Sequence, residues 1–177
     1  DAADNCSANP IITHVADVSD NQTCPETITR TYRVEDDCGN FIEVDQMIIV
    51  SDDVNPTASN PPTEMVQCIG DVSAPNVNVI TDALDNCTVN PIITHVGDVS
   101  DNQTCPETIT RTYRVEDDCG NFVEVEQLII INDDVAPTAS NPPGIMVDCI
   151  SNVPPADAAV VTDAADNCTA NPNVTLE

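Results

Sequence analysis

The 177-residue chain has no tryptophan and no lysine, and its large aromatic side chains are two tyrosines and two phenylalanines. The chain has thirty-one acidic residues and four arginines, so its formal net charge is −27. A surface that binds nucleic acid needs cationic side chains to displace phosphate counterions, so nucleic acid is excluded as a partner. We expect no membrane insertion in this stretch, because no apolar run approaches the roughly 20 residues that span a bilayer.

Catalytic motifs are also missing. The sequence has no nucleophile elbow, no HExxH, no phosphate-binding glycine loop and no lysine to act as a base. Acidic pairs occur in turns, without any sign of the large groove that a carboxylate-based hydrolase needs. We therefore expect that the protein is not an enzyme.

What the chain does contain is a repeat of 81 residues. Positions 1–81 match positions 82–162 without a gap at 59 places and differ at 22, and the string CPETITRTYRVEDDCGN occurs identically at 24–40 and 105–121. We expect a complete repeat at 57–134, the C-terminal part of another at 1–53, and the N-terminal part of a third at 138–177.

The pattern of each repeat predicts short strands. Branched and aromatic residues alternate with polar ones in Thr108–Val115 and Phe122–Ile131, and Gly120 with Asn121 between them suits a turn. Further strands are expected at 65–68, 77–81 and 91–96, whereas 14 prolines argue against helices. The fold class expected is all-β: tandem, disulfide-braced, immunoglobulin-like antiparallel β-sandwiches.

Nine cysteines lie far apart, without any CxxC pair, which indicates disulfides rather than zinc and therefore an oxidising, extracellular location. If successive strands run up and down, Cys68 and Cys105 share one end of the repeat, and Cys87 and Cys119 share the other. The pairs expected on this basis are Cys68–Cys105, Cys87–Cys119 and, by translation, Cys6–Cys38. The alternative pairing, Cys68–Cys119 with Cys87–Cys105, stays open.

The strings TDALDNC, CPETITRTYRVEDDCGN and QLIIINDDVAPT resemble the HYR-like, immunoglobulin-type repeats of giant surface adhesins in Bacteroidota, including gliding-motility adhesins. The resemblance covers the whole stretch. It implies export by the type IX secretion system, display on the cell surface, and a role in adhesion or gliding. HYR domains often carry a cysteine in the last strand, but 122–131 has none, so their disulfide pattern is not transferred.

Acidic loops are the candidate metal site. Calcium takes six to eight oxygen ligands, mostly from carboxylates and carbonyls. If the strands run as argued, the acidic residues between repeats lie beside loops of the next one. Without a D-x-D-x-D-G spacing, the same residues also suit turns and solubility. The residues proposed to bind calcium are Asp52, Asp53, Asp82, Asp85, Asn86, Glu116, Asp117, Asp118, Asp133 and Asp134.

Two arginines have a structural role in this interpretation. Arg111 is in phase with Ile109, Tyr113 and Val115, which places it on the inward face, and Arg30 is its equivalent one repeat earlier. We expect each guanidinium to bind a carboxylate or loop carbonyls while its stem packs.

The function expected is that of a stalk or filament segment in a large secreted adhesin. Its partners would be neighbouring repeats of the same chain and other copies in a fibre, with an external surface or polysaccharide bound through other domains. The alternative is that each repeat itself binds glycan or a surface. The lack of tryptophan disfavours this alternative, because sugars usually stack on exposed aromatic rings.

Overall fold

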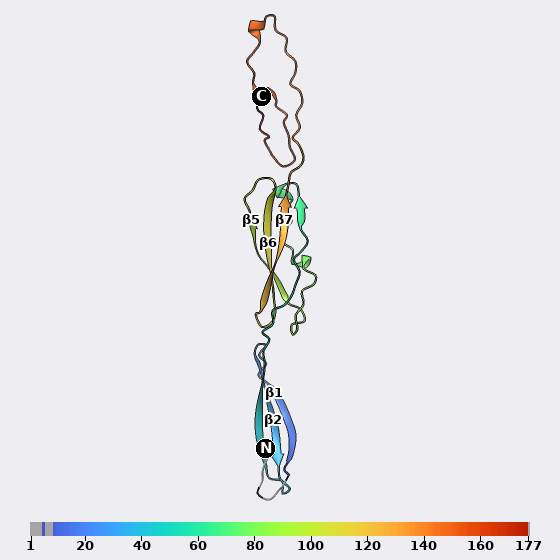
Figure 1. The fold of residues 1–177 in the computed structure, drawn as a ribbon, viewed down its shortest axis with the longest axis vertical. Helices are drawn as coiled ribbons and strands as arrows, with labels where there is room; N and C mark the ends of the chain where they lie inside the picture. Colours follow the sequence, from blue (N-terminus) through green and yellow to red (C-terminus); the bar gives the residue numbers. More distant parts are fainter. Residues whose placement is uncertain (1–4, 6–8, 177) are drawn as a thin grey trace. The chain divides into compact units, whose positions relative to one another are not determined.

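The computed structural model describes residue 5 and residues 9–176. The described chain is nearly all β, and its only helices are four short 3₁₀ turns. Seven strands form two sheets, which confirms the all-β fold class (Figure 1). The first sheet has the order β1-β2-β3, and the second has the order β4-β7-β6-β5.

The first sheet consists of β1 (Ile11–Ser19), β2 (Glu26–Glu35) and β3 (Phe41–Val50), all antiparallel. β1 and β2 pair with a bulge between His14 and Ala16, and β2 and β3 pair without interruption. The turn between β2 and β3 contains Gly39 at φ +85°, a conformation that glycine adopts without steric cost.

The second sheet consists of β5 (Ile92–Ser100), β6 (Glu107–Glu116), β7 (Phe122–Ile131) and the short β4 (Glu64–Val66). β4 pairs with β7 in parallel, which an all-antiparallel prediction did not include. Along β6 every second residue is buried, and along the second half of β7 the same alternation holds, so one face of each strand lies inward.

The strand predicted at 77–81 is wrong. Val77–Val79 forms a 3₁₀ turn, in which the Val79 N–H donates to the Asn76 carbonyl. The Asn76 side chain accepts from the Asn78 N–H, and such a local bond competes with strand pairing.

The chain's contacts divide it into two compact units. The first contains Asp1–Ser59, Ile80–Thr94 and Tyr113–Val125, and the second contains Asn60–Val79, His95–Thr112 and Glu126–Glu177. In the first unit Ile80, Tyr113, Val115 and Val125 are buried. In the second, Ile109, Ile129 and Ile131 form a core against which Val66 and Val72 pack. The expected repeat boundaries stay a prediction.

Candidate metal centre and the disulfides

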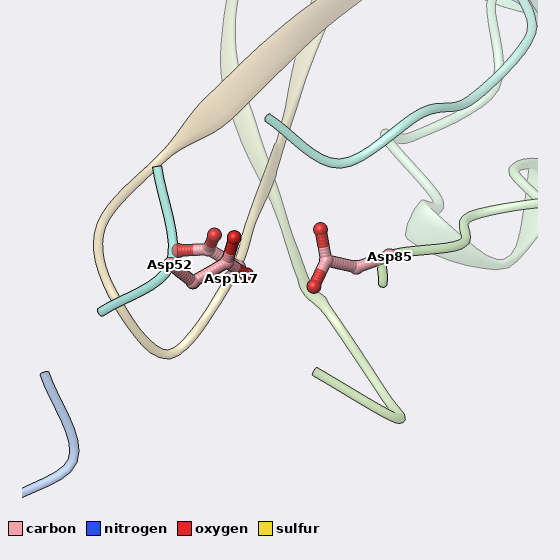
Figure 2. A group of neighbouring side chains, drawn as sticks. All are labelled: Asp52, Asp85 and Asp117. Atoms are coloured by element: carbon pink, nitrogen blue, oxygen red, sulfur yellow. The ribbon is translucent and has the colours of Figure 1, made fainter. Parts of the chain in front are cut away.

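Three carboxylates of the first unit lie together: Asp52, just after β3, Asp85, in the loop before β5, and Asp117, at the end of β6. One oxygen from each lies within 4.8 Å of the others. Figure 2 shows the Asp85 side chain reaching toward the other two from a separate segment. Two ligands of one calcium ion, each 2.3–2.6 Å from it, are separated by up to about 5 Å, so this spacing fits.

Local turns hold two of these side chains. Asp117 is 4% exposed, and its carboxylate accepts the Cys119 and Asn121 backbone N–H groups, both at 2.8 Å, and the Asn121 side-chain amide at 2.8 Å. Asp85 Oδ2 accepts the N–H groups of Cys87 at 2.9 Å and Thr88 at 2.7 Å. These backbone donors, the Thr88 N–H first, lower the pKa of Asp85 and favour its charged form.

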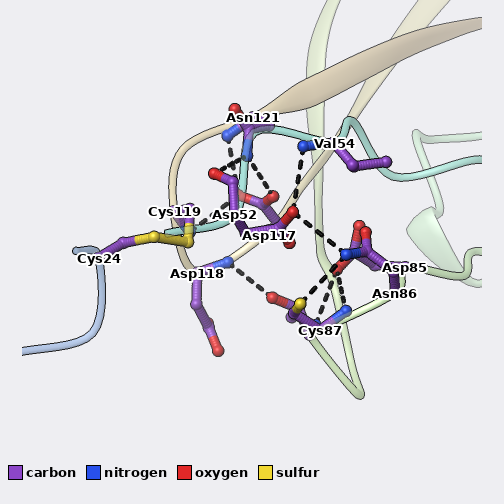
Figure 3. The surroundings of a disulfide bond; sticks show 11 residues. Cys24, Asp52, Val54, Asp85, Asn86, Cys87, Asp117, Asp118, Cys119 and Asn121 are labelled. Atoms are coloured by element: carbon purple, nitrogen blue, oxygen red, sulfur yellow. Dashed lines mark hydrogen bonds between the residues drawn. A yellow bond between two sulfur atoms is a disulfide. The ribbon is translucent and has the colours of Figure 1, made fainter. Parts of the chain in front are cut away.

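The side-chain amides of two asparagines hold Asp52 beside Asp85 and Asp117. Asn86 Nδ2 donates to Asp52 Oδ1 at 3.2 Å, and Asn121 Nδ2 donates to the Asp52 carbonyl at 3.0 Å. Figure 3 shows these bonds around the Asp52, Asp85 and Asp117 carboxylates. Asn121 thus joins the turn of Asp117 to the segment of Asp52, a role that the sequence did not reveal.

The cluster leaves two carboxylate oxygens without partners. Asp52 Oδ2 and Asp85 Oδ1 are buried and accept no hydrogen bond. Uncompensated charge is costly in such surroundings. The four arginines of the chain pair elsewhere, with Asp17, Glu35, Asp98 and Glu124. The donor set therefore fits a hard divalent cation such as calcium.

The same arrangement begins again 81 residues later, in the second unit. Asn167 Nδ2 donates to Asp133 Oδ1 at 3.3 Å, as Asn86 does to Asp52. Asp166 Oδ2 accepts the N–H groups of Cys168 and Thr169 at 3.0 and 2.8 Å, as Asp85 does with Cys87 and Thr88. These contacts of the Asp52 and Asp85 carboxylates thus recur at the equivalent positions.

The other acidic residues expected at the site do not belong to this group of three. Asp82 accepts the Ser59 N–H at 3.2 Å, and hydrogen bonding with Ser59, first with its side chain and then with its backbone, lowers the pKa of Asp82. Asp53, Asp118 and Asp134 are exposed, whereas Glu116 is half-buried. Of the residues predicted for calcium, Asp52, Asp85 and Asp117 come together, and Asn86 bonds to one of them.

The disulfides join cysteines that are far apart in the sequence, and they differ from the expected pairs. Cys24 pairs with Cys119, and Cys68 pairs with Cys168, over 95 and 100 residues of sequence. Cys68–Cys105 and Cys87–Cys119 are therefore not formed. The expected Cys6–Cys38 pair includes Cys6, which lies outside the described residues.

The expected pairs Cys68–Cys105 and Cys87–Cys119 both assumed that each cysteine finds its partner within one repeat. The loop of Cys24 instead meets the turn after β6, where Cys119 follows Asp117 (Figure 3). Beside it, the Cys87 thiol is free, and burial together with the Asp52 carboxylate raises its pKa.

Arg111 binds a carboxylate on the inward side of the sheet. The residue is 2% exposed, and its Nε and Nη2 donate to Asp98 at 2.9–3.2 Å. His95 Nε2 lies 2.8 Å from the same carboxylate. Arg30 makes the equivalent contact with Asp17 at 2.7–2.9 Å but is half-exposed.

The comparisons with known proteins fit this arrangement. Residues 56–131 match the family described as the HYR-like domain with 4 cysteines. No curated protein and no solved structure matches the chain. HYR-like domains are extracellular, immunoglobulin-like modules of adhesion type, and no helix of the described residues is long and apolar enough to cross a membrane. Residues 56–131 thus form a HYR-like domain with four cysteines.

Proposed function

We propose that the chain is a stalk or filament segment of a large secreted adhesin, in which tandem repeats hold a distal binding domain away from the cell. The observation that carries this proposal is the disulfide pattern. With the predicted repeat boundaries, each bridge joins a cysteine of one repeat to a cysteine of the next, Cys24 to Cys119 and Cys68 to Cys168. A bridge between periods adds nothing to a binding site within one of them, but it does resist separation of the periods.

Calcium has a part in this proposal. With the predicted repeat boundaries, Asp52 belongs to one repeat, whereas Asp85 and Asp117 belong to the next, so the cluster draws its side chains from both. A calcium ion bound there stiffens the connection between the periods, which a spacer requires. The buried oxygens without partners, Asp52 Oδ2 and Asp85 Oδ1, are its principal support.

Binding of glycan by each repeat is the competing function, and three of the four large aromatic residues count against it. Tyr113 is fully buried. Phe41 and Phe122 each lie under an arginine, with Arg33 at 3.5 Å and Arg114 at 4.0 Å from the ring centroids. These rings are therefore covered on one face by a guanidinium, whereas a sugar-binding platform needs an open ring. Export by the type IX secretion system and a part in gliding rest on the sequence resemblance.

The isolated chain distinguishes the two functions. As a spacer, it shows no saturable binding to a glycan array or to polysaccharide-coated beads, in calcium or in chelator. Antibodies raised against it label intact, unpermeabilised cells that produce the protein. Saturable binding of the isolated chain to one glycan class would refute the spacer function, and labelling only after permeabilisation would refute the surface location.

A further inference from the structure

The disulfide between Cys24 and Cys119 starts at one end of the ribbon that β2 and β3 form. The register of these strands pairs Glu26 with Val50, and Cys24 precedes Glu26 by two positions. Asp52 follows Val50 by two positions, so Cys24 and Asp52 leave the antiparallel ribbon at the same end. The bridge and this carboxylate are therefore attached to one end of one ribbon.

The other end of the disulfide lies in the turn after β6 that holds Asp117. The Cys119 N–H donates to Asp117 Oδ1 at 2.8 Å, and the Asn121 side-chain amide donates to Asp117 Oδ2 at 2.8 Å. Figure 3 shows the Cys24–Cys119 bridge leaving this turn beside the Asp117 carboxylate. The bridge thus ends two residues from a second member of the group of three carboxylates.

The loop that carries Cys24 is held by hydrogen bonds of its own. The Asp20 N–H donates to the Thr27 carbonyl at 3.0 Å. Asp20 Oδ1 accepts the N–H groups of Gln22 at 3.0 Å and Thr27 at 3.1 Å. The loop is therefore fixed to the start of β2, and a bridge anchored in the loop also positions the end of the ribbon.

Charge in the group of three opposes this arrangement when no cation is bound. Oxygens of Asp52, Asp85 and Asp117 lie within 4.8 Å of one another, so the carboxylates repel. Asp52 Oδ2 and Asp85 Oδ1 are also buried without a hydrogen-bond donor, which is costly for charged groups. Movement of Asp52 away from the other two would relieve both costs. Asn86 and Asn121 each resist it with one hydrogen bond to Asp52, whereas the bridge resists it covalently.

We propose that the Cys24–Cys119 bridge and a calcium ion bound by Asp52, Asp85 and Asp117 stabilise each other. This coupling rests on the calcium site of the proposed function and adds that the redox state of the bridge regulates the site. The oxidised chain offers calcium an assembled set of carboxylates, whereas the reduced chain must first bring Asp52 back to the other two. By linkage, calcium stabilises the bridge against reduction by the same factor by which the bridge raises calcium affinity.

The redox step is a thiol–disulfide exchange. Two molecules of a thiol such as glutathione reduce the Cys24–Cys119 bridge, which yields two cysteine thiols and one molecule of oxidised glutathione. In the reverse reaction the two cysteine thiols lose two protons and two electrons to oxidised glutathione, which becomes two thiols. Calcium is bound by carboxylate oxygens and keeps its charge throughout. Outside the cell, where thiols oxidise, calcium would thus help to keep this bridge closed.

Calcium affinity with and without the bridge tests the first half of the coupling. Two double variants are compared in a background that carries serine at Cys6, Cys38, Cys87, Cys105 and Cys149. Cys24→Ser with Cys119→Ser removes the bridge beside the carboxylates, and Cys68→Ser with Cys168→Ser removes the bridge of the second unit. Titration calorimetry with calcium should give a Kd at least about tenfold higher for the first variant and unchanged for the second, with circular dichroism confirming that both fold.

Resistance of the bridge to reduction tests the second half and leaves both bridges unsubstituted. The background chain is equilibrated at graded ratios of reduced to oxidised glutathione, either in saturating calcium or in chelator. Free thiols are then trapped and mapped by mass spectrometry. Calcium should shift the glutathione ratio that half-reduces Cys24–Cys119 by at least about tenfold, in the direction of more reduced glutathione. The ratio that half-reduces Cys68–Cys168 should stay unchanged, which provides a control within the same molecule.

Two substitutions separate the possible failures. Asp117→Asn should abolish the effect of calcium on the bridge, whereas Asp118→Asn, outside the group of three, should retain it. Equal calcium affinity with and without the bridge, or a calcium effect that Asp117→Asn retains, would overturn the coupling while the calcium site stands. An oxidised chain that binds no calcium would overturn the site and the coupling together. Saturable binding of a glycan would refute only the spacer function.

Discussion

Tension applied to the two ends of the chain tests the disulfide pattern most directly. A bridge removes the residues that it encloses from the length that can be stretched. Cys68–Cys168 encloses 100 residues and Cys24–Cys119 encloses 95. An extended chain spans about 3.3–3.6 Å per residue. Each bridge alone therefore shortens the fully extended chain, by about 340 Å for Cys68–Cys168 and about 320 Å for Cys24–Cys119.

The two effects are not additive, because the enclosed segments overlap. Cys68 lies between Cys24 and Cys119, so a taut path from end to end can use only one bridge. The shortest path uses Cys68–Cys168. Removal of Cys24–Cys119 alone should therefore leave the final extension unchanged, and removal of Cys68–Cys168 alone should lengthen it by only about 20 Å.

Single-molecule force spectroscopy with handles at both termini measures this extension. The background carries serine at the remaining cysteines, Cys6, Cys38, Cys87, Cys105 and Cys149. We compare this chain with Cys24→Ser, Cys68→Ser and the double variant, each with and without dithiothreitol. The double variant and every reduced sample should extend about 340 Å further than the oxidised chain.

Two results would refute the reasoning. Full extension of either oxidised single variant would mean that its remaining bridge is not formed as described. A final extension of the oxidised chain that matches the reduced one would mean that neither bridge is formed. A pairing within one period would enclose far fewer residues and would give a correspondingly smaller difference.

Three further predictions concern the ion pair and the cluster. Arg111→Ala should lower the free energy of unfolding in urea by about 3 kcal/mol, because it removes a buried, packed side chain together with its ion pair to Asp98. Arg30→Ala, at the half-exposed equivalent, should leave the free energy of unfolding unchanged, and equal losses would contradict this reasoning. Hydrogen bonds, first from Arg111, lower the pKa of Asp98, so this carboxylate stabilises the fold above its unfolded pKa of about 3.9 and loses that effect as pH falls through the lower folded value. Asp98→Asn should therefore flatten the dependence of stability on pH below about pH 4, measured by urea unfolding at several pH values, and an unchanged slope would count against it. Calcium at ten times its Kd should raise the free energy of unfolding by about 1.4 kcal/mol, measured by calorimetry. Asp117→Asn should abolish this effect, whereas Asp118→Asn, outside the cluster, should retain it. An equal stability in calcium and in chelator would exclude the site.

Local sequence patterns were sufficient for much of the fold. Apolar and polar residues alternate in Thr108–Val115 and Phe122–Ile131. This alternation predicted β6 and β7, because successive side chains of a strand point to opposite faces of the sheet. The turn at Gly120 followed from the need for positive φ, which the structure has at +86°. The pattern wrongly predicted a strand at Val77–Val79. There the Asn76 side chain accepts a hydrogen bond from the Asn78 backbone N–H, and the segment forms a 3₁₀ turn instead.

The candidate site could be predicted only as a set of acidic loops. Asp and Asn are common in turns, so composition alone could not separate Asp117, which is buried, from Asp118, which is exposed. The missed residue, Asn121, has a signal in the four-residue spacing from Asp117, because this spacing lets one amide close the turn. Its second bond, to the Asp52 carbonyl, depends on residues 69 positions apart.

The sequence by itself determined the 81-residue period, the acidic charge, the all-β class and the number of cysteines in each period, because each of these is either a direct count or a local pattern. Only the tertiary structure decided which cysteines pair and which carboxylates meet. Equivalent cysteines have nearly identical neighbours along the chain, so local chemistry cannot distinguish Cys105 from Cys24 as a partner of Cys119. A disulfide needs two sulfur atoms at bonding distance, and that proximity is set by folding across the boundary between periods.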